Sequence, residues 1–113
     1  MILHDLHVHT LRSPCGTMTV GEVVARAAQL GMRSIALTDH GLSMAPSRFI
    51  FHIYAKRFPA RWEGVRVYKG IEANVLDPEG HVDVPFEVLP WFDVVSLGLH
   101  PIQGLLENRG PEA

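Results

Sequence analysis

The chain has little of what marks secreted, membrane or nucleic-acid-binding proteins. Its 113 residues include one cysteine, Cys15, so no disulfide can form within the chain, and a reducing, cytoplasmic compartment is expected. No apolar run approaches the roughly 20 residues that cross a bilayer, and Met1–Asp5 lacks the basic start of a signal peptide. The formal net charge of −2 gives no reason to expect nucleic acid or a membrane as a partner.

Repeats, linkers and low-complexity stretches are also missing, as are a Ser/His/Asp order and a glycine-rich phosphate loop. An apolar content of 47% with 19% charged residues is ordinary for one small globular domain. The unusual feature is histidine, which occurs seven times. The histidines are therefore the first candidates for functional residues.

Four apolar runs end at residues of the metal-binding type. The runs are Ile2–His9, Ser34–His40, Val65–Glu72 and Asp93–His100. The residues at their ends are His7, His9, His40, Glu72 and His100. If the runs are parallel strands, their carboxyl ends lie on one rim, where α/β folds build their sites. The pattern predicts a metal centre on that rim.

A helix is predicted between the first two runs. Thr19 and Glu22 have the spacing of a capping box, apolar residues follow at helical spacing, and Gly31 ends the helix. Strand, helix and strand then form a right-handed βαβ unit. The weaker signals are a second helix within Ala45–Phe58, a turn at Asp77–Gly80, a short strand at His81–Val84 and a helical turn within Pro85–Phe92.

The predicted fold class is α/β, a partial (β/α) barrel of about four parallel strands. A closed barrel needs roughly 200 residues or more, so this chain supplies about half of one. The open half would expose an apolar layer and an unpaired edge. We therefore expect a missing half-barrel or a second copy as partner, and a flexible tail at residues 104–113.

The candidate residues differ in how specific they are. His7 and His9 are two apart on a strand, so both project from one face and can hold one ion. Asp39 is read with equal weight as a carboxylate that orients His40 and as a helix cap or turn residue. Arg12 is a candidate phosphate clamp, although a solvated arginine is the favoured interpretation. The remaining histidines are taken as structural or exposed: His4, His52 and His81.

These motifs resemble the PHP superfamily, the metal-dependent phosphoesterase domains named for polymerases and histidinol phosphatase. The resemblance is carried by Asp5-Leu6-His7-Val8-His9-Thr10, Thr38-Asp39-His40-Gly41, Gly70-Ile71-Glu72-Ala73-Asn74 and the strand ending at His100. It is closest to small bacterial PHP phosphatases and implies that residues 1–103 are the first half of a distorted (β/α)7 barrel.

The resemblance also implies up to three divalent ions, zinc first, with manganese or iron as alternatives. His7 and His9 would hold one ion, Glu72 would bridge it to a second ion bound by His100, and His40 would bind a third. Cys15 stands where the family usually has a histidine. It is either a thiolate ligand, which we favour, or a small loop residue.

The implied reaction is hydrolysis of a small phosphorylated substrate by metal-activated water. The family's later histidine and its terminal Asp-x-His pair are absent from these 113 residues, which leaves open whether they catalyse alone. Two alternatives are an inactive metal-binding half-domain and a polymerase-associated accessory domain.

Overall fold

The computed structural model describes residues 2–11, 13, 15–41 and 57–99. The elements are β1 (His4–Val8), α1 (Val20–Gln29), β2 (Ser34–Leu37), β3 (Arg61–Trp62), β4 (Val65–Asn74), the 3-10 helix η1 (Phe86–Trp91) and β5 (Val94–Gly98). They form a mixed α/β structure with an open sheet of five strands. Within these ranges, neither helix has the length and apolarity to span a membrane.

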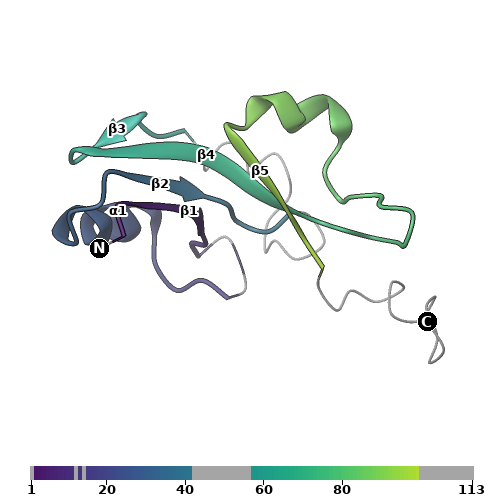
Figure 1. The fold of residues 1–113 in the computed structure, drawn as a ribbon, viewed down its shortest axis with the longest axis horizontal. Coiled ribbons are helices and arrows are strands. Elements are labelled where there is room, and N and C mark those ends of the chain that lie inside the picture. Colours follow the sequence, from purple (N-terminus) through teal and green to yellow (C-terminus); the bar gives the residue numbers. More distant parts are fainter. Residues whose placement is uncertain (1, 12, 14, 42–56, 100–113) are drawn as a thin grey trace.

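The long strand β4 organises the sheet. Strand β1 pairs with β2, and β2 with β4, all in parallel, which confirms the predicted direction of these strands. On its other side β4 pairs with antiparallel β3 near Val65 and with parallel β5 from Gly70 to Asn74. Figure 1 shows β1, β2 and α1 beside the first half of β4, and β5 and η1 beside its second half.

Successive side chains of β4 point to opposite faces of the sheet, so its apolar residues share one face. One face contributes Val65, Val67, Ile71 and Ala73 to two apolar clusters. The first cluster joins β2 and β4 to α1, and the second joins β4 to the segment around Val84 and Phe92. The opposite face carries Arg66, Tyr68, Gly70, Glu72 and Asn74. Apart from Lys69, the polar residues of β4 are therefore aligned on the face away from α1.

A bulge in β1 places the two histidines on that same polar face. Asp5 pairs with Ile35 and Val8 with Leu37, so β1 contains one residue more than β2 over this stretch. Without the extra residue, His7 and His9 would have the parity of Asp5 and would face α1. The Asp5 carboxylate accepts the backbone N–H of His7 at 3.1 Å within this irregular stretch. Bulges commonly re-aim side chains beside functional sites.

The predicted helix is confirmed. Thr19 Oγ1 accepts the backbone N–H of Glu22 at 3.2 Å, and Glu22 Oε1 accepts the backbone N–H of Thr19 at 3.1 Å. The helix runs from Val20 to Gln29, and Gly31 follows with a φ of +72°. A positive φ suits glycine, which explains why the helix ends at this point.

Two predictions about the strands need correction, and one hairpin was not predicted. The hairpin formed by β3 and β4 was not predicted; it turns at Glu63 and Gly64, which both have positive φ, as a two-residue hairpin loop requires. Strand β4 continues two residues beyond Glu72, so Glu72 does not end it. The expected strand at 81–84 is a single bridge between Val82 and Val75.

The predicted helical turn within Pro85–Phe92 is confirmed as η1, a 3-10 helix. The expected second helix falls mainly on residues 42–56, and the expected tail on 104–113, both outside the described residues. Apolar side chains are exposed on the two outer strands, as an open sheet predicts. Leu6 of β1 is 51% exposed, and Leu97 of β5 is 66% exposed.

Candidate metal centre

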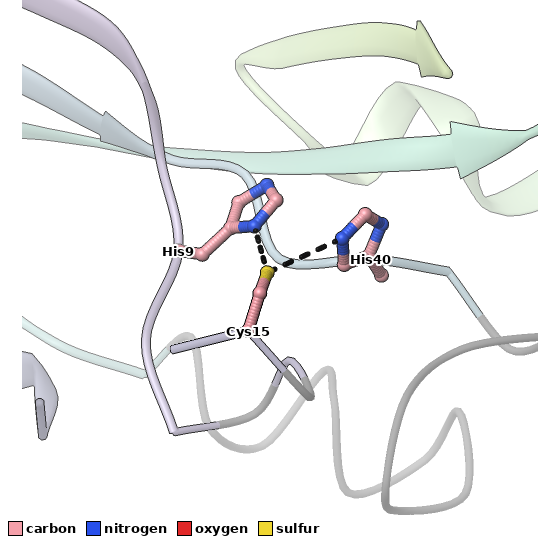
Figure 2. Close-up of side chains that lie close together, drawn as sticks. All are labelled: His9, Cys15 and His40. Atoms are coloured by element: carbon pink, nitrogen blue, oxygen red, sulfur yellow. Dashed lines mark hydrogen bonds between the residues drawn. The ribbon is translucent and has the colours of Figure 1, made fainter. Parts of the chain in front are cut away.

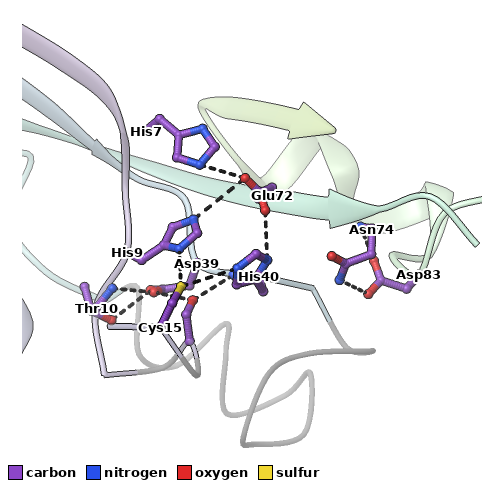
Figure 3. A network of polar contacts seen from close by, with 10 residues as sticks. His7, His9, Thr10, Cys15, Asp39, His40, Glu72, Asn74 and Asp83 are labelled. Atoms are coloured by element: carbon purple, nitrogen blue, oxygen red, sulfur yellow. Dashed lines mark hydrogen bonds and ion pairs between the residues drawn. The ribbon is translucent and has the colours of Figure 1, made fainter. Parts of the chain in front are cut away.

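The buried carboxylate of Glu72 lies among three imidazoles. Glu72 is only 3% exposed. Its Oε1 is 2.7 Å from Nε2 of His7 and 3.8 Å from Nε2 of His9, and its Oε2 is 2.8 Å from Nδ1 of His40. Figure 3 shows these side chains pointing toward one another from β1, the end of β2 and β4. His40 and Glu72 also form a backbone bridge, which fixes their relative height in the sheet.

A second group forms around Cys15. Its Sγ lies 2.9 Å from Nδ1 of His9 and 3.5 Å from Nε2 of His40, as Figure 2 shows. Two sets of donor atoms thus each lie within 4.8 Å of one another: His7, His9 and Glu72, and His9, Cys15 and His40. The two sets have His9 in common. They match the donor types that bind zinc and similar divalent ions.

The His9 ring has one nitrogen toward each set. Its Nδ1 faces Cys15, and its Nε2 is buried without a hydrogen-bond partner among the described residues. A buried imidazole nitrogen without such a partner fits a metal ligand better than a packing residue. Because a neutral imidazole has one lone pair for coordination, His9 would serve one set at a time.

Burial lowers the pKa of His9, and the neighbouring His40 lowers it further. The carboxylate of Glu72 acts in the opposite direction but does not reverse the shift. His9 is therefore neutral near pH 7, as a ligand must be, because a protonated imidazole has no lone pair to donate.

Asp39 holds the loop that carries Cys15. Its carboxylate, 1% exposed as a residue, accepts the backbone N–H of Thr10 at 2.6 Å, the Thr10 hydroxyl at 2.9 Å and the Ser13 hydroxyl at 2.9 Å. Ser13 Oγ in turn accepts the backbone N–H of His40 at 2.9 Å. Within the described residues, these contacts favour the interpretation of Asp39 as a positioning carboxylate. It ties the loop after β1 to the end of β2, which brings Cys15 to His40.

Gly16 allows this loop to close. A Cβ at Gly16 would lie 1.9 Å from the carbonyl oxygen of Thr10, and backbone atoms cannot move aside as a flexible side chain can. The backbone N–H of Gly16 donates to the carbonyl of Ser13 at 3.0 Å. The close approach that places Cys15 next to the imidazoles thus depends on a residue without a side chain.

Two residues near the rim were not predicted to matter. Asn74, fully buried, donates to Asp83 through its backbone N–H at 2.8 Å and its side-chain Nδ2 at 2.6 Å. The Asp83 carboxylate also lies where a Cβ on Gly41 would meet it at 2.4 Å. Asp83 thereby fixes the segment after β4 beside the residue that follows His40 (Figure 3). Only its place in a loop after a strand could have suggested this role.

The structure brings five of the predicted ligands together: His7, His9, Cys15, His40 and Glu72. The other two candidates, Arg12 and His100, lie outside the described residues, as does His52. His4 and His81 are exposed, as predicted, and His81 lies beside Asp77 and Glu79 in a surface turn. The ligand predicted for the second ion, His100, thus lies outside the described residues.

Comparison with known proteins shows which family the sequence matches. Residues 5–104 match the sequence model of the PHP domain family. A probable phosphatase of Syntrophotalea carbinolica is 39% identical over 97 residues, which cover 85% of this chain and 40% of that protein. Probable phosphatases of Caldanaerobacter subterraneus and Pectobacterium carotovorum are each 37% identical over 97 residues, covering 85% of this chain and 38% and 40% of their own lengths. The chain thus spans about two fifths of these relatives.

Proposed function

Because the chain belongs to the PHP domain family, we propose that it provides the metal-binding rim of a phosphoesterase that hydrolyses a small phosphorylated substrate. One observation carries the proposal: three imidazoles, a thiol and a buried carboxylate converge beside the carboxyl ends of the parallel strands β1 and β2. The printed names of its relatives, probable phosphatases, support the same reaction class.

The donor atoms suggest which residues would hold ions. His7, Glu72 and Nε2 of His9 form one set, and Cys15 and His40 form the core of the other, with Nδ1 of His9 as their alternative partner. A thiolate with imidazoles favours zinc, whereas the set with Glu72 also suits manganese or iron. Glu72 is the candidate bridge between the sets, because its two oxygens face His7 and His40 separately.

Bound divalent ions would supply Lewis acidity, which makes water a better nucleophile near neutral pH and offsets the charge of a phosphate ester. The chain's own residues prepare the site for that chemistry. Burial keeps His9 neutral, and Asp39 holds the Cys15 loop against the end of β2. Cys15 is a ligand in this proposal and not a nucleophile. Arg12 as a phosphate clamp and His100 as a further ligand remain part of the proposal.

Release of phosphate from a generic phosphomonoester, with zinc or manganese supplied, tests the proposal. His9→Ala should abolish metal-dependent turnover because His9 belongs to both donor sets, whereas His81→Ala, which removes an exposed histidine, should leave turnover unchanged. Metal bound without turnover would favour the inactive metal-binding half-domain. Failure to bind zinc or manganese would refute both.

A further inference from the structure

A row of polar residues that includes two arginines crosses the sheet at the end opposite the metal centre. The pairing register aligns His4 with Ser34, Ser34 with Arg66 and Arg66 with Arg61, so the row crosses β1, β2, β4 and β3 in turn. Partners in register project from the same face of a sheet. Arg33, which precedes β2, joins the row from the side.

These side chains line a cavity of about 380 Å³. The residues that line it include three arginines, Arg33, Arg61 and Arg66, together with His4, Ser34 and Tyr68. No carboxylate is among the residues that line it, and none of the three arginines forms an ion pair within the described part of the chain. Glu63, in the adjacent hairpin turn, is exposed and does not line the cavity. The cavity is therefore strongly positive.

The strand register places two positively charged side chains next to each other. Arg61 and Arg66 are direct cross-strand partners, and like charges in this position repel. Arg66 is also held in place, because its Nη1 donates to the carbonyl of Ala60 at 3.1 Å and its guanidinium lies 4.6 Å from the centre of the Tyr68 ring. One anchored N–H leaves the other N–H groups of Arg66 for a ligand.

We propose that this cavity binds a small phosphate-bearing anion of the pyrophosphate class. Guanidinium groups pair with phosphate oxygens through two parallel hydrogen bonds, and all three cations here are arginines. The size of the cavity suits a small molecule, and the formal net charge of −2 does not favour a nucleic acid as the ligand. His40 of the metal centre lies six residues after Ser34 of the cavity, which is about 20 Å of extended chain at roughly 3.3 Å per residue.

Calorimetric titration of the metal-free protein with pyrophosphate tests this proposal independently of any metal chemistry. Pyrophosphate should bind the unchanged chain, and Arg33→Gln and Arg61→Gln should each weaken binding about 10-fold or more, as expected for one charged hydrogen-bond donor. Both side chains are exposed, so the substitutions leave the core intact. Arg26→Gln on α1 removes an exposed arginine outside the cavity and is the matched control.

Citrate serves as the second titrant, because a tricarboxylate offers similar charge without phosphorus. Tighter binding of citrate than of pyrophosphate would overturn the assignment to phosphate. The site itself would be refuted if pyrophosphate failed to bind, or if Arg26→Gln weakened binding as much as Arg61→Gln. A loss confined to the cavity variants, with pyrophosphate preferred, would establish it.

Discussion

The two ends of one sheet present opposite chemistry on the same face. At the carboxyl end, Glu72 of β4 lies among imidazoles and near a thiol, and the lone pairs of these groups can bind cations. At the amino end, Arg66 of the same strand lines a cavity with Arg33 and Arg61, and the N–H groups of arginine can bind anions. Both residues have the same parity on β4 and face away from α1. The pairing register of the strands and the parity of side chains along β4 thus place two chemically different candidate sites on one face of the sheet.

The ends also differ in how they are held. At the carboxyl end, Glu72 and His40 are each 3% exposed, and His40 is tied to Asp39 through Ser13, whereas His7 and Cys15 are exposed. At the amino end, Arg33, Arg61 and His4 are exposed, and the β3–β4 hairpin provides the geometry. Substitutions should therefore have larger effects at the carboxyl end, where removing one group leaves others buried without partners.

The largest expected effect comes from His9→Ala. Because both donor sets include His9, zinc affinity should fall by more than about 100-fold, beyond the 10- to 100-fold typical of residues that only support a ligand. Competition with a chromogenic chelator measures the affinity. Arg61→Gln, at the other end of the sheet, should leave zinc affinity unchanged. Equal losses in both variants would show that the two ends are not independent.

Asp39→Asn should weaken zinc binding about 10- to 100-fold, because Asp39 positions the Cys15 loop without joining either donor set. The matched control is Asp93→Asn, whose carboxylate also accepts a backbone N–H, that of Lys69 at 2.9 Å, but away from the rim. The same chelator competition applies. If Asp93→Asn lowers zinc affinity as much as Asp39→Asn does, the positioning role is refuted.

Gly16→Ala should weaken metal binding through Cys15 while sparing the set that contains Glu72. The added Cβ would lie 1.9 Å from the Thr10 carbonyl oxygen, so the loop must shift and move the thiol away from His40. Gly21→Ala is the control, since its Cβ would meet only Trp62 at 3.9 Å. That change should stabilise α1 by about 0.5–1 kcal/mol. Thermal unfolding and cobalt absorption together distinguish the two glycines.

The smallest effects belong to the cap of α1, which touches neither end. Thr19→Ala should lower the free energy of unfolding by about 1 kcal/mol. The hydrogen bond with the Thr19 backbone lowers the pKa of Glu22 below its ordinary 4.5, so this contribution is present above pH 4.5 and is lost as the pH falls through the folded-state pKa. Glu22→Gln should remove that acid dependence in denaturant titrations. A change in zinc affinity in either variant would contradict the separation of roles.

Much of this arrangement was predictable from local patterns. The capping box of α1 and the third strand depend on neighbouring residues, and both predictions hold. The convergence of His7, His40 and Glu72 followed from strand direction, because parallel carboxyl ends share an edge. Their role as ligands stays a prediction, as does the cytoplasmic compartment.

Other features depend on pairing between distant segments, which a local pattern does not contain. The bulge in β1 exists only relative to β2, and a plain alternation would have turned His9 toward α1. The row of polar residues at the amino end is formed by the pairing register of β2, β4 and β3. From the sequence, a helix cap or turn residue was as good an interpretation of Asp39 as a positioning carboxylate, because its partners Thr10 and Ser13 lie far from it along the chain.

Cobalt titration of the metal-free protein tests the central claim most directly, because a bound thiolate gives Co²⁺ a strong near-ultraviolet charge-transfer band. Cys15 is the only cysteine, so the assignment is unambiguous. The account predicts this band in the unchanged chain and its loss in Cys15→Ser, with cobalt still bound through His7, His9 and Glu72. A chain that binds no cobalt, or one whose cobalt spectrum is unchanged by Cys15→Ser, would contradict it.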